Sequence, residues 1–399
     1  RLENQDWLEN PSVLKIYGLL NDGRNKKSLF VGGCVRNSIL GLAVEDIDMA
    51  TIMTPQEVVE ILEQKGVKVI PTGLDHGTVT AVIDGRAFEI TTLRKDVQTD
   101  GRHASVAYTD DWLEDARRRD FTMNTLLADI NGQVYDPLEQ GYVDLKKGRV
   151  AFVGEAAKRI EEDYLRILRF FRFHALYGVG KADAVALKAC KDGAQNIRKL
   201  SAERITQEFL KILMTDNAQE TLILMFENNI LSEFFVSENQ MILFRDFCNF
   251  QKRYGLIALS SRLYVLANLD KEHLRNILEL LLIPKVFLKD IQAIDQILQL
   301  PDLDKDQAVK VAVYKYGRVP AAQALMIELV LDRVMNGYAP KALEIIQSWD
   351  VPDFPISGED LKKAGLKPGP ALGQALSRLE EQWIKSGFQE EKETLLKAV

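Results

Sequence analysis

The spacing of apolar residues changes about 155 residues into this chain. Up to that point, short apolar runs of strand length alternate with segments of helical period. The strand candidates are Ser28–Val31, Val67–Ile70, Thr78–Ile83, Ala87–Ile90 and Leu126–Ile130. Asp84–Gly85 and Asn131–Gly132 suit two-residue hairpin turns, so parts of the sheet are expected to be antiparallel. The pattern predicts an α+β region.

From about Glu155 onwards the apolar residues follow a helical period almost throughout, as in the stripes Leu274–Leu282 and Ile291–Leu298. Pro301, Pro320 and the segment 352–370 interrupt this pattern. We therefore expect an all-helical remainder.

Length and composition narrow the class of protein. A chain of 399 residues that is 46% apolar can form two or more modules, each with its own core. Neither a membrane-length apolar run nor a charged-then-apolar leader occurs, so a soluble protein without membrane contact is expected. Cys34, Cys190 and Cys248 are odd in number and widely spaced, which disfavours disulfides and a zinc site. The cytoplasm is the expected compartment, with the mitochondrial matrix as the alternative.

The overall charge of −7 is unusual for a protein that binds nucleic acid. Between Lys146 and His174, however, eight basic residues stand against four acidic ones. This segment is either a basic patch or an ordinary solvated surface. Neighbouring motifs must decide between the two.

The segment Leu29–Gly41 joins a predicted strand, the glycine pair Gly32–Gly33 and an amphipathic helix. Free backbone N–H groups at the start of a helix can bind a phosphate, and Arg36 would lie one turn into that helix. A glycine pair after a strand also forms ordinary tight turns, which is the alternative.

Three acidic residues are expected on one face of the sheet. Asp46 and Asp48 alternate along an extended segment, and Glu89 is the only acid in an apolar strand. Like charges in one place are costly unless they are paired or bind a metal, so Mg²⁺ bridging them to a triphosphate is the predicted explanation. Two such ions could activate a 3′-hydroxyl and stabilise a pyrophosphate leaving group. The alternative is a solvated edge with salt-bridged acids.

These motifs resemble a known superfamily. Gly32–Arg36 followed by Asp46–Asp48 resembles the signature of the polymerase-β nucleotidyltransferases. Arg118–Asn124, Glu162–Arg166 and Leu200–Ile205 resemble the successive motifs of the class II CCA-adding enzymes and their poly(A) polymerase relatives. The resemblance covers roughly residues 28 to 215 in order and spacing.

Two details refine the resemblance. The segment Glu162–Phe173 is similar to the α-proteobacterial and mitochondrial form of these enzymes, and Phe354–Gly373 resembles the bacterial tail. Asn37 departs from the family pattern, which has Asp after the arginine. The resemblance implies a head with a polymerase-β-like mixed sheet at 1–150. An all-helical neck at 151–215, body at 216–350 and tRNA-contacting tail at 351–399 would follow.

The resemblance also implies roles for Arg119 and Asp120, which would distinguish ribonucleotides from deoxyribonucleotides through the 2′-hydroxyl. A salt bridge at a helix end is the alternative.

The helix expected from Tyr164 places an apolar stripe on one side and charged residues on the other. Asp163 can accept a hydrogen bond from the amino group of cytosine or adenine, while Arg166 donates to the ring nitrogen. Uracil and guanine present the opposite pattern and would be rejected. This agrees with the resemblance, in which the matching residues select the base, and Arg169 and Arg172 would hold triphosphate oxygens. An exposed ion pair between Asp163 and Arg166 is the alternative.

The segment Arg94–Thr109 has little apolar periodicity and is expected to be a mobile polar loop. It resembles the flexible loop that CCA-adding enzymes use in switching from C to A. His76 and His174 are expected to be structural.

These features predict an enzyme that adds C, C and A to the 3′ end of tRNA from CTP and ATP, with two Mg²⁺ ions and no stable protein partner. A poly(A) polymerase or an enzyme that adds only CC or only A shares the head motifs. A catalytically silent RNA-binding protein is the alternative from another class.

Overall fold

The computed structural model describes residues 1–22, 27–70, 77–96, 106–231 and 237–398. The chain divides into two compact units, of which the first comprises Arg1–Asn217 with Ile223–Glu233. The second comprises Ala218–Leu222 with Phe234–Val399. All the predicted site residues belong to the first unit.

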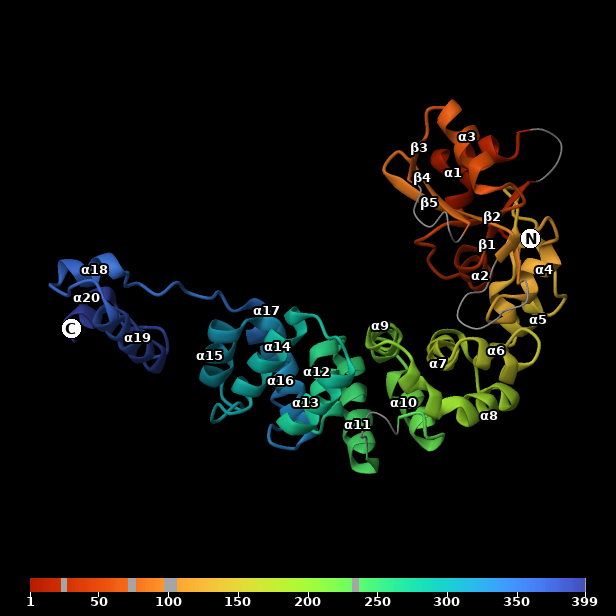
Figure 1. The fold of residues 1–399 in the computed structure, drawn as a ribbon. Helices are drawn as coiled ribbons and strands as arrows, with labels where there is room; N and C mark the ends of the chain where they lie inside the picture. The colour runs from red at the N-terminus through yellow and green to blue at the C-terminus, as the bar shows by residue number, and fades with distance from the viewer. Residues whose placement is uncertain (23–26, 71–76, 97–105, 232–236, 399) are drawn as a thin grey trace. The chain divides into compact units, whose positions relative to one another are not determined.

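The part of the first unit that precedes α6 (Ala156–Glu162) is built on a seven-stranded mixed sheet (Figure 1), with the strand order β3-β4-β5-β2-β1-β8-β9. The strands are β1 (Ser28–Val31), β2 (Asp48–Thr51), β3 (Lys68–Ile70), β4 (Thr78–Ile83), β5 (Arg86–Thr92), β8 (Leu127–Ala128) and β9 (Val134–Tyr135). The pairing of β2 with β5 is parallel, and the other pairings are antiparallel. The predicted α+β head with a mixed sheet is confirmed.

The five predicted strands are present, although β3 and β8 are shorter than expected. The Asp84–Gly85 turn joins β4 to β5, and both turn residues have positive φ, at 50° and 78°. The Asn131–Gly132 turn lies between β8 and β9. The two-residue turn is therefore confirmed at Asp84–Gly85. The second hairpin is present, but five residues connect its strands, so the two-residue turn predicted there is wrong.

The expectation of a mobile polar loop over Arg94–Thr109 is wrong at its ends, which form strands. There β6 (Arg94–Asp96) and β7 (Val106–Tyr108) pair antiparallel in a separate two-stranded sheet. The ends pair because backbone hydrogen bonding needs no apolar pattern. Residues 97–105 and His76 lie outside the described residues.

The two faces of the seven-stranded sheet differ in what covers them. Helices α1 (Pro11–Leu20) and α3 (Pro55–Gln64) pack on one face, where Phe30 stacks on Tyr17 with ring centroids 5.3 Å apart. The opposite face carries a small core of Leu29, Val31, Ala50, Leu93 and Leu127, against which Trp112 packs. Since side chains alternate along a strand, Asp48 lies on the same face as Ala50.

Short helices and turns complete the first unit beside the sheet. They are η1 (Asp6–Glu9), α2 (Gly33–Leu40), α4 (Trp112–Arg117), η3 (Thr122–Asn124) and α5 (Gly141–Lys146). The helices that follow are α6 (Ala156–Glu162), α7 (Leu165–Tyr177), α8 (Ala184–Gly193), η4 (Ala194–Lys199) and α9 (Ala202–Leu213). Residues of α10 (Ala218–Glu227) belong to both units. Ile167, Leu168, Phe171 and Ala175 of α7 are buried, which confirms the predicted apolar stripe.

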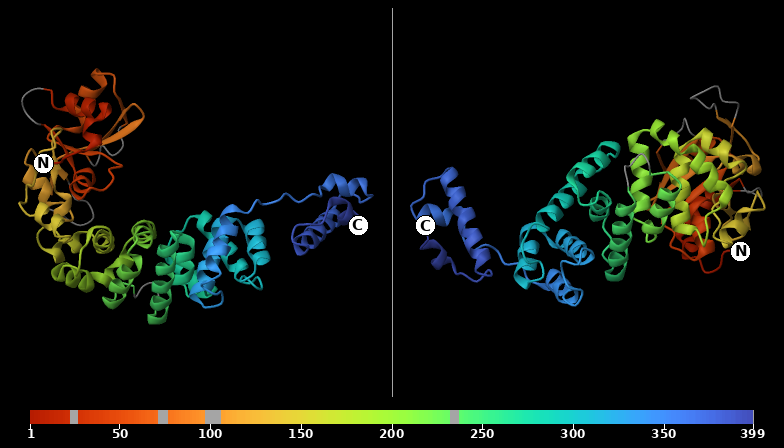
Figure 2. Two further views of the ribbon diagram at one scale, coloured as in Figure 1. Left: turned by 180° about the vertical axis from the view of Figure 1, so that it is seen from behind. Right: turned by 90° about the horizontal axis from the view of Figure 1, so that it is seen from below.

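The second unit contains only helices among its described residues, as expected (Figure 2). They are α11 (Glu238–Tyr254), α12 (Leu259–Leu266), α13 (Lys271–Leu280), α14 (Lys285–Ile297), α15 (Asp306–Tyr316), α16 (Arg318–Val330), α17 (Ala339–Ser348), α18 (Gly358–Lys363), α19 (Pro370–Lys385) and α20 (Lys392–Leu396). None of the described helices is long and apolar enough to cross a membrane. Cys34, Cys190 and Cys248 are all buried free thiols.

Candidate functional site

The glycine pair forms the junction between β1 and α2. Gly32 has φ 72° and ψ −121°, a conformation that only glycine adopts readily, and it precedes the first residue of α2, Gly33. The backbone N–H of Arg36 donates to the carbonyl of Gly32 at 2.9 Å, which fixes the first turn. The predicted strand–glycine–helix arrangement is therefore present.

Arg36 is buried, and its guanidinium is held from several sides. It donates to Asn124 Oδ1 and to the Tyr177 hydroxyl, each at 2.7 Å, and lies 4.2 Å from the centre of the Tyr177 ring. The Oδ1 atom of Asn37 accepts from Arg36 at 3.1 Å, while its Nδ2 donates to the carbonyl of Ala43 at 2.9 Å. Asn37 therefore keeps a contact with Arg36 and adds a donor that an aspartate lacks.

Asp46, Asp48 and Glu89, here named the carboxylate triplet, gather at one end of the sheet. Asp48 begins β2 and is the register partner of Glu89 in β5, so their side chains leave the sheet on the same face. Burial, followed by the charges of Glu89 and Asp46, raises the pKa of Asp48 to about 6, while Arg119 opposes the shift. The predicted placement of Asp48 and Glu89 on one face is confirmed.

The donor chemistry of the triplet fits a divalent cation. In the described part of the chain, no three acidic, histidine or cysteine side chains are arranged to hold one metal ion. Mg²⁺ does not need such a set, because it is commonly bound through one or two carboxylates, water and substrate phosphates. Burial and then the charges of Glu89 and Asp46 raise the pKa of Asp48, and a bound cation would relieve the repulsion among these charges.

A pocket of about 430 Å³, here named the arginine pocket, adjoins the start of α2. It is lined by Gly32, Gly33, Arg36, Arg119, Asp120, Asn124, Asp163, Leu165, Arg166, Arg169, Phe173 and Arg204. Eight of the predicted nucleotide-binding residues therefore line one pocket. Arg172 is the ninth and does not line it.

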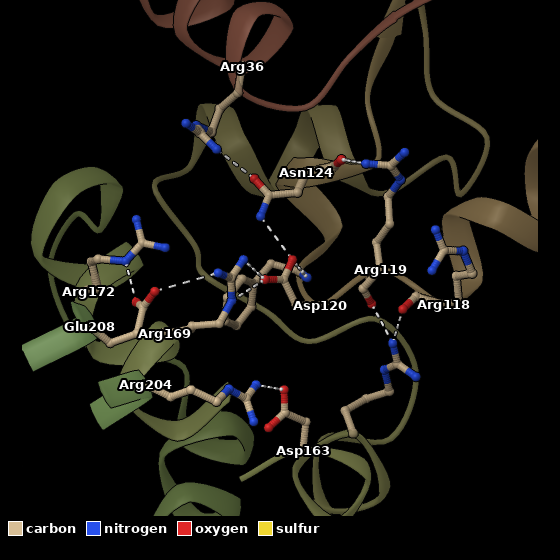
Figure 3. Close-up of polar contacts among 12 residues, drawn as sticks. Arg36, Arg118, Arg119, Asp120, Asn124, Asp163, Arg169, Arg172, Arg204 and Glu208 are labelled. Carbon is tan, nitrogen blue, oxygen red and sulfur yellow. Dashed lines mark hydrogen bonds and ion pairs between the residues drawn. The ribbon is translucent and has the colours of Figure 1, made fainter. Parts of the chain in front are cut away.

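Asp120 lies among donors inside this pocket. Its Oδ2 accepts from Arg169 Nε at 2.9 Å, and its Oδ1 accepts from Asn124 Nδ2 at 2.9 Å (Figure 3). Burial alone would raise the pKa of Asp120, but the charge of Arg169 and these hydrogen bonds hold it below its ordinary value. Asp120 is therefore an ionised acceptor held in a fixed orientation.

Asp163 and Arg166 both line the pocket, but their side chains pair with other residues. Asp163 lies between α6 and α7, where its Oδ1 accepts from the N–H of Leu165 and its Oδ2 accepts from Arg204 Nη2 at 2.8 Å. Arg166 pairs with Glu162 at 2.5 Å. The alternative of an ion pair between Asp163 and Arg166 is therefore wrong, because α7 begins only at Leu165 and Asp163 turns towards α9.

Arg172 pairs with the buried carboxylate of Glu208 on α9 at 2.6 Å (Figure 3). The same carboxylate lies 3.8 Å from Arg169. In this structure Glu208 therefore ties α7 to α9, and a triphosphate-binding role for Arg172 stays a prediction.

Sequence reasoning did not single out Asn124 and Arg204. Both belong to segments that carry the family resemblance, Arg118–Asn124 and Leu200–Ile205, but their partners are distant in sequence. The pair of Arg36 and Asn124 forms where α2 meets η3, and the pair of Asp163 and Arg204 forms where α7 packs on α9.

Three protein families match successive parts of the chain. The Poly A polymerase head domain matches residues 28–151, and the Probable RNA and SrmB- binding site of polymerase A matches 183–238. The family described as tRNA nucleotidyltransferase domain 2 putative matches 258–399.

Individual relatives match nearly the whole chain. CCA tRNA nucleotidyltransferase 1, mitochondrial, of Danio rerio is 35% identical over 391 residues, covering 92% of this chain and 85% of the relative. The CCA-adding enzyme of Limosilactobacillus fermentum is 32% identical, covering 93% and 92%. The solved structure of the Bacillus stearothermophilus CCA-adding enzyme in complex with CTP is 26% identical, with a TM-score of 0.76 and coverage of 96% and 95%. The chain therefore belongs to the family of CCA-adding enzymes, the CCA tRNA nucleotidyltransferases.

Proposed function

We propose that this chain adds C, C and A to the 3′ end of tRNA from CTP and ATP, with release of pyrophosphate. Membership of the family makes it a nucleotidyltransferase. The observation that carries the proposal is that Asp163, Arg166, Arg119 and Asp120 line one pocket, with Arg119 also close enough to influence Asp48. Such a pocket offers contacts to the base and the sugar of one nucleotide beside a group of carboxylates.

The carboxylates of Asp46, Asp48 and Glu89 would hold two Mg²⁺ ions. When bound, such ions supply activation of the attacking 3′-hydroxyl and stabilisation of the leaving pyrophosphate. Glu89 and Asp48 face the same side of the sheet, and Asp46 contributes its charge to the same region. The triplet would thus supply oxygen ligands for the ions.

The base would be selected by Asp163 and Arg166. A carboxylate has about four acceptor positions, so Asp163 can accept from the amino group of cytosine or adenine while it keeps Arg204 and the N–H of Leu165. Arg166 is anchored to Glu162 and to the carbonyl of Arg159, and it keeps unused donors for a ring nitrogen. The pairing with other residues thus orients both side chains.

The remaining pocket residues suit the sugar and the phosphates. Arg119 and Asp120 supply a donor and an acceptor for the 2′-hydroxyl, which can both donate and accept. Arg169 lines the pocket with the N–H groups at the start of α2 nearby, and we assign it to triphosphate oxygens together with Arg172.

Product length tests the proposal. The purified chain is incubated with Mg²⁺, a tRNA that ends before CCA, and each nucleoside triphosphate alone and in combination. We expect extension that stops after CCA. A stop after CC, addition of A alone, or an open-ended A tail would each assign the chain to a relative within the same superfamily. Unextended tRNA that still binds would favour a catalytically silent RNA-binding protein.

A second experiment separates full CCA addition from CC addition. Replacing residues 96–107 with a short Gly/Ser linker leaves the triplet, Arg36, Asp163 and Arg166 in place, so CC addition is expected to survive. Adenine is larger than cytosine and requires Asp163 and Arg166 to shift. The resemblance assigns the switch from C to A to this segment, so A addition is expected to fall sharply without it. Equal declines of both activities would contradict a role of this segment in the switch.

A further inference from the structure

Helix α4 carries a buried carboxylate to which the proposed function gives no role. Asp115 is only 3% exposed, although neighbouring residues of the helix reach solvent. Burying a carboxylate is costly unless its oxygens are fully hydrogen bonded. The surroundings of Asp115 therefore show what the residue does.

Both oxygens of Asp115 are occupied by donors. Oδ1 accepts from Arg118 Nε at 2.9 Å and from the backbone N–H of Arg94 at 3.2 Å. Oδ2 accepts from Arg119 Nε at 3.1 Å and Nη2 at 3.0 Å, which is a two-point contact with one edge of the guanidinium. Although burial alone would raise the pKa of Asp115, the charges of Arg119 and Arg118 hold it below its ordinary value.

The three donors come from places that matter to the site. Arg119 lines the arginine pocket and is the cation that opposes the pKa shift of Asp48. Arg94 begins β6, the first strand of the separate β6–β7 sheet. The backbone carbonyls of Arg118 and Arg119 also accept from Arg159 Nη2, so the main chain beneath these arginines is fixed as well. Asp115 thus joins the start of β6 to a pocket arginine.

We propose that Asp115 is a positioning residue for nucleotide binding: it aims Arg119 at the nucleotide and couples that aim to the position of strand β6. The proposal rests on the proposed function, because it assigns Arg119 to the nucleotide. Without the two-point contact, the flexible Arg119 side chain has several rotamers and a second carboxylate, Asp48, to approach.

A double-mutant cycle separates this role from a merely structural ion pair. Asp115→Asn keeps the size of the side chain but removes the charge and places an amide donor against an arginine. Arg119→Gln removes the cation that Asp115 is proposed to aim. The readout is kcat/KM for ATP and for 2′-deoxy-ATP on a tRNA that ends in CC, because loss of stability alone would not change their ratio.

Asp144→Asn is the matched control. Asp144 is 1% exposed and accepts from Thr122, Gln140 and Arg149, but it does not line the arginine pocket. We expect a lower melting temperature for this variant with an unchanged ratio. Should Asp115→Asn fail to fold, Asp115→Glu keeps the charge and displaces it by one methylene, so it should move the ratio in the same direction by less.

If Asp115 acts through Arg119, Asp115→Asn lowers kcat/KM for ATP by about ten- to a hundredfold and narrows the ATP to 2′-deoxy-ATP ratio. Added to Arg119→Gln, it then has little further effect, because two residues of one unit are not additive. Fully multiplicative losses, or an unchanged ratio in all Asp115 variants, would overturn the inference. The wild-type chain tests the proposed function separately. If it does not extend tRNA at all, this result contradicts the proposed function and not the coupling between Asp115 and Arg119.

Discussion

The two halves of the site differ in how their charges are balanced. In the carboxylate triplet, the like charges of Glu89 and Asp46 add to burial in raising the pKa of Asp48. In the arginine pocket, the acids have arginine partners: Asp120 pairs with Arg169, and Asp163 pairs with Arg204. One half therefore needs positive charge from outside, whereas each acid that lines the other half is paired with an arginine of the chain.

This difference shows what each half is prepared to do. Paired charges fix side-chain orientation before a ligand arrives, which suits groups that must compare one base with another. Unbalanced carboxylates hold a cation only when it is supplied, so the chemical step is expected to depend on metal, while the pocket keeps its shape without it.

The largest expected effect comes from removing part of the triplet. Asp48→Ala or Asp46→Ala should lower addition of both C and A by roughly a thousandfold or more, because bound metal supplies several kcal/mol to the transition state. Binding of tRNA, measured by filter retention or anisotropy, should stay nearly unchanged. Glu60→Ala, at an exposed position of α3, is the control and should behave as wild type. Substantial turnover in either triplet variant would remove these residues from catalysis.

A smaller effect on activity is expected when residues of the arginine pocket are replaced. Asp163→Ala and Arg166→Ala should reduce discrimination against UTP and GTP by about ten- to a hundredfold, because a two-point base contact contributes about 1 to 3 kcal/mol. Arg204→Ala should give a weaker change in the same direction, since Asp163 keeps its contact with the N–H of Leu165. The measurement is single-nucleotide extension with each triphosphate. Unchanged preference would make these pairs purely structural.

The carboxylate triplet should also affect how the free energy of unfolding depends on pH. The folded-state pKa of Asp48 is raised from 3.8 to about 6. Its contribution to the free energy of unfolding is therefore fully present below pH 3.8 and is lost as the pH rises through 6. Asp48→Asn should therefore stabilise the metal-free protein at pH 7.5, by up to about 3 kcal/mol, and have little effect near pH 4. Denaturant unfolding in EDTA measures this. A destabilised variant at pH 7.5 would contradict a raised pKa of Asp48.

The smallest effect is expected at Asn37. Asn37→Asp keeps an acceptor for Arg36 and gains charge attraction, but loses the hydrogen bond to the carbonyl of Ala43. The two changes oppose each other, so the free energy of unfolding should shift by less than about 1.5 kcal/mol. Denaturant unfolding of the two proteins side by side gives the value. A loss well beyond that range would show that Asn37 is essential for holding Arg36.

The features that local sequence predicts are those whose cause is local. The Asp84–Gly85 turn was predictable because few residue pairs adopt positive φ in succession, and the α7 stripe because apolar spacing reports burial. Family resemblance supplied the roles of Arg119 and Asp120. The partners of Asp163 and Arg36 were not predictable, because Arg204 and Tyr177 are 41 and 141 residues away in the chain. The strand pairing of β6 with β7 lacked any apolar pattern.

The three buried cysteines can report how often the structure around each of them opens. Burial raises the pKa of Cys34 to about 12, that of Cys248 to about 11, and that of Cys190 upwards as well. Electrophiles react with the thiolate, so each cysteine is expected to stay unreactive until the residues around it move apart. Cys34 lies in α2, Cys190 in α8 and Cys248 in α11. Alkylation rates at the three cysteines, measured by mass spectrometry, would give separate rates of local opening for α2, for α8 and for α11 in the second unit.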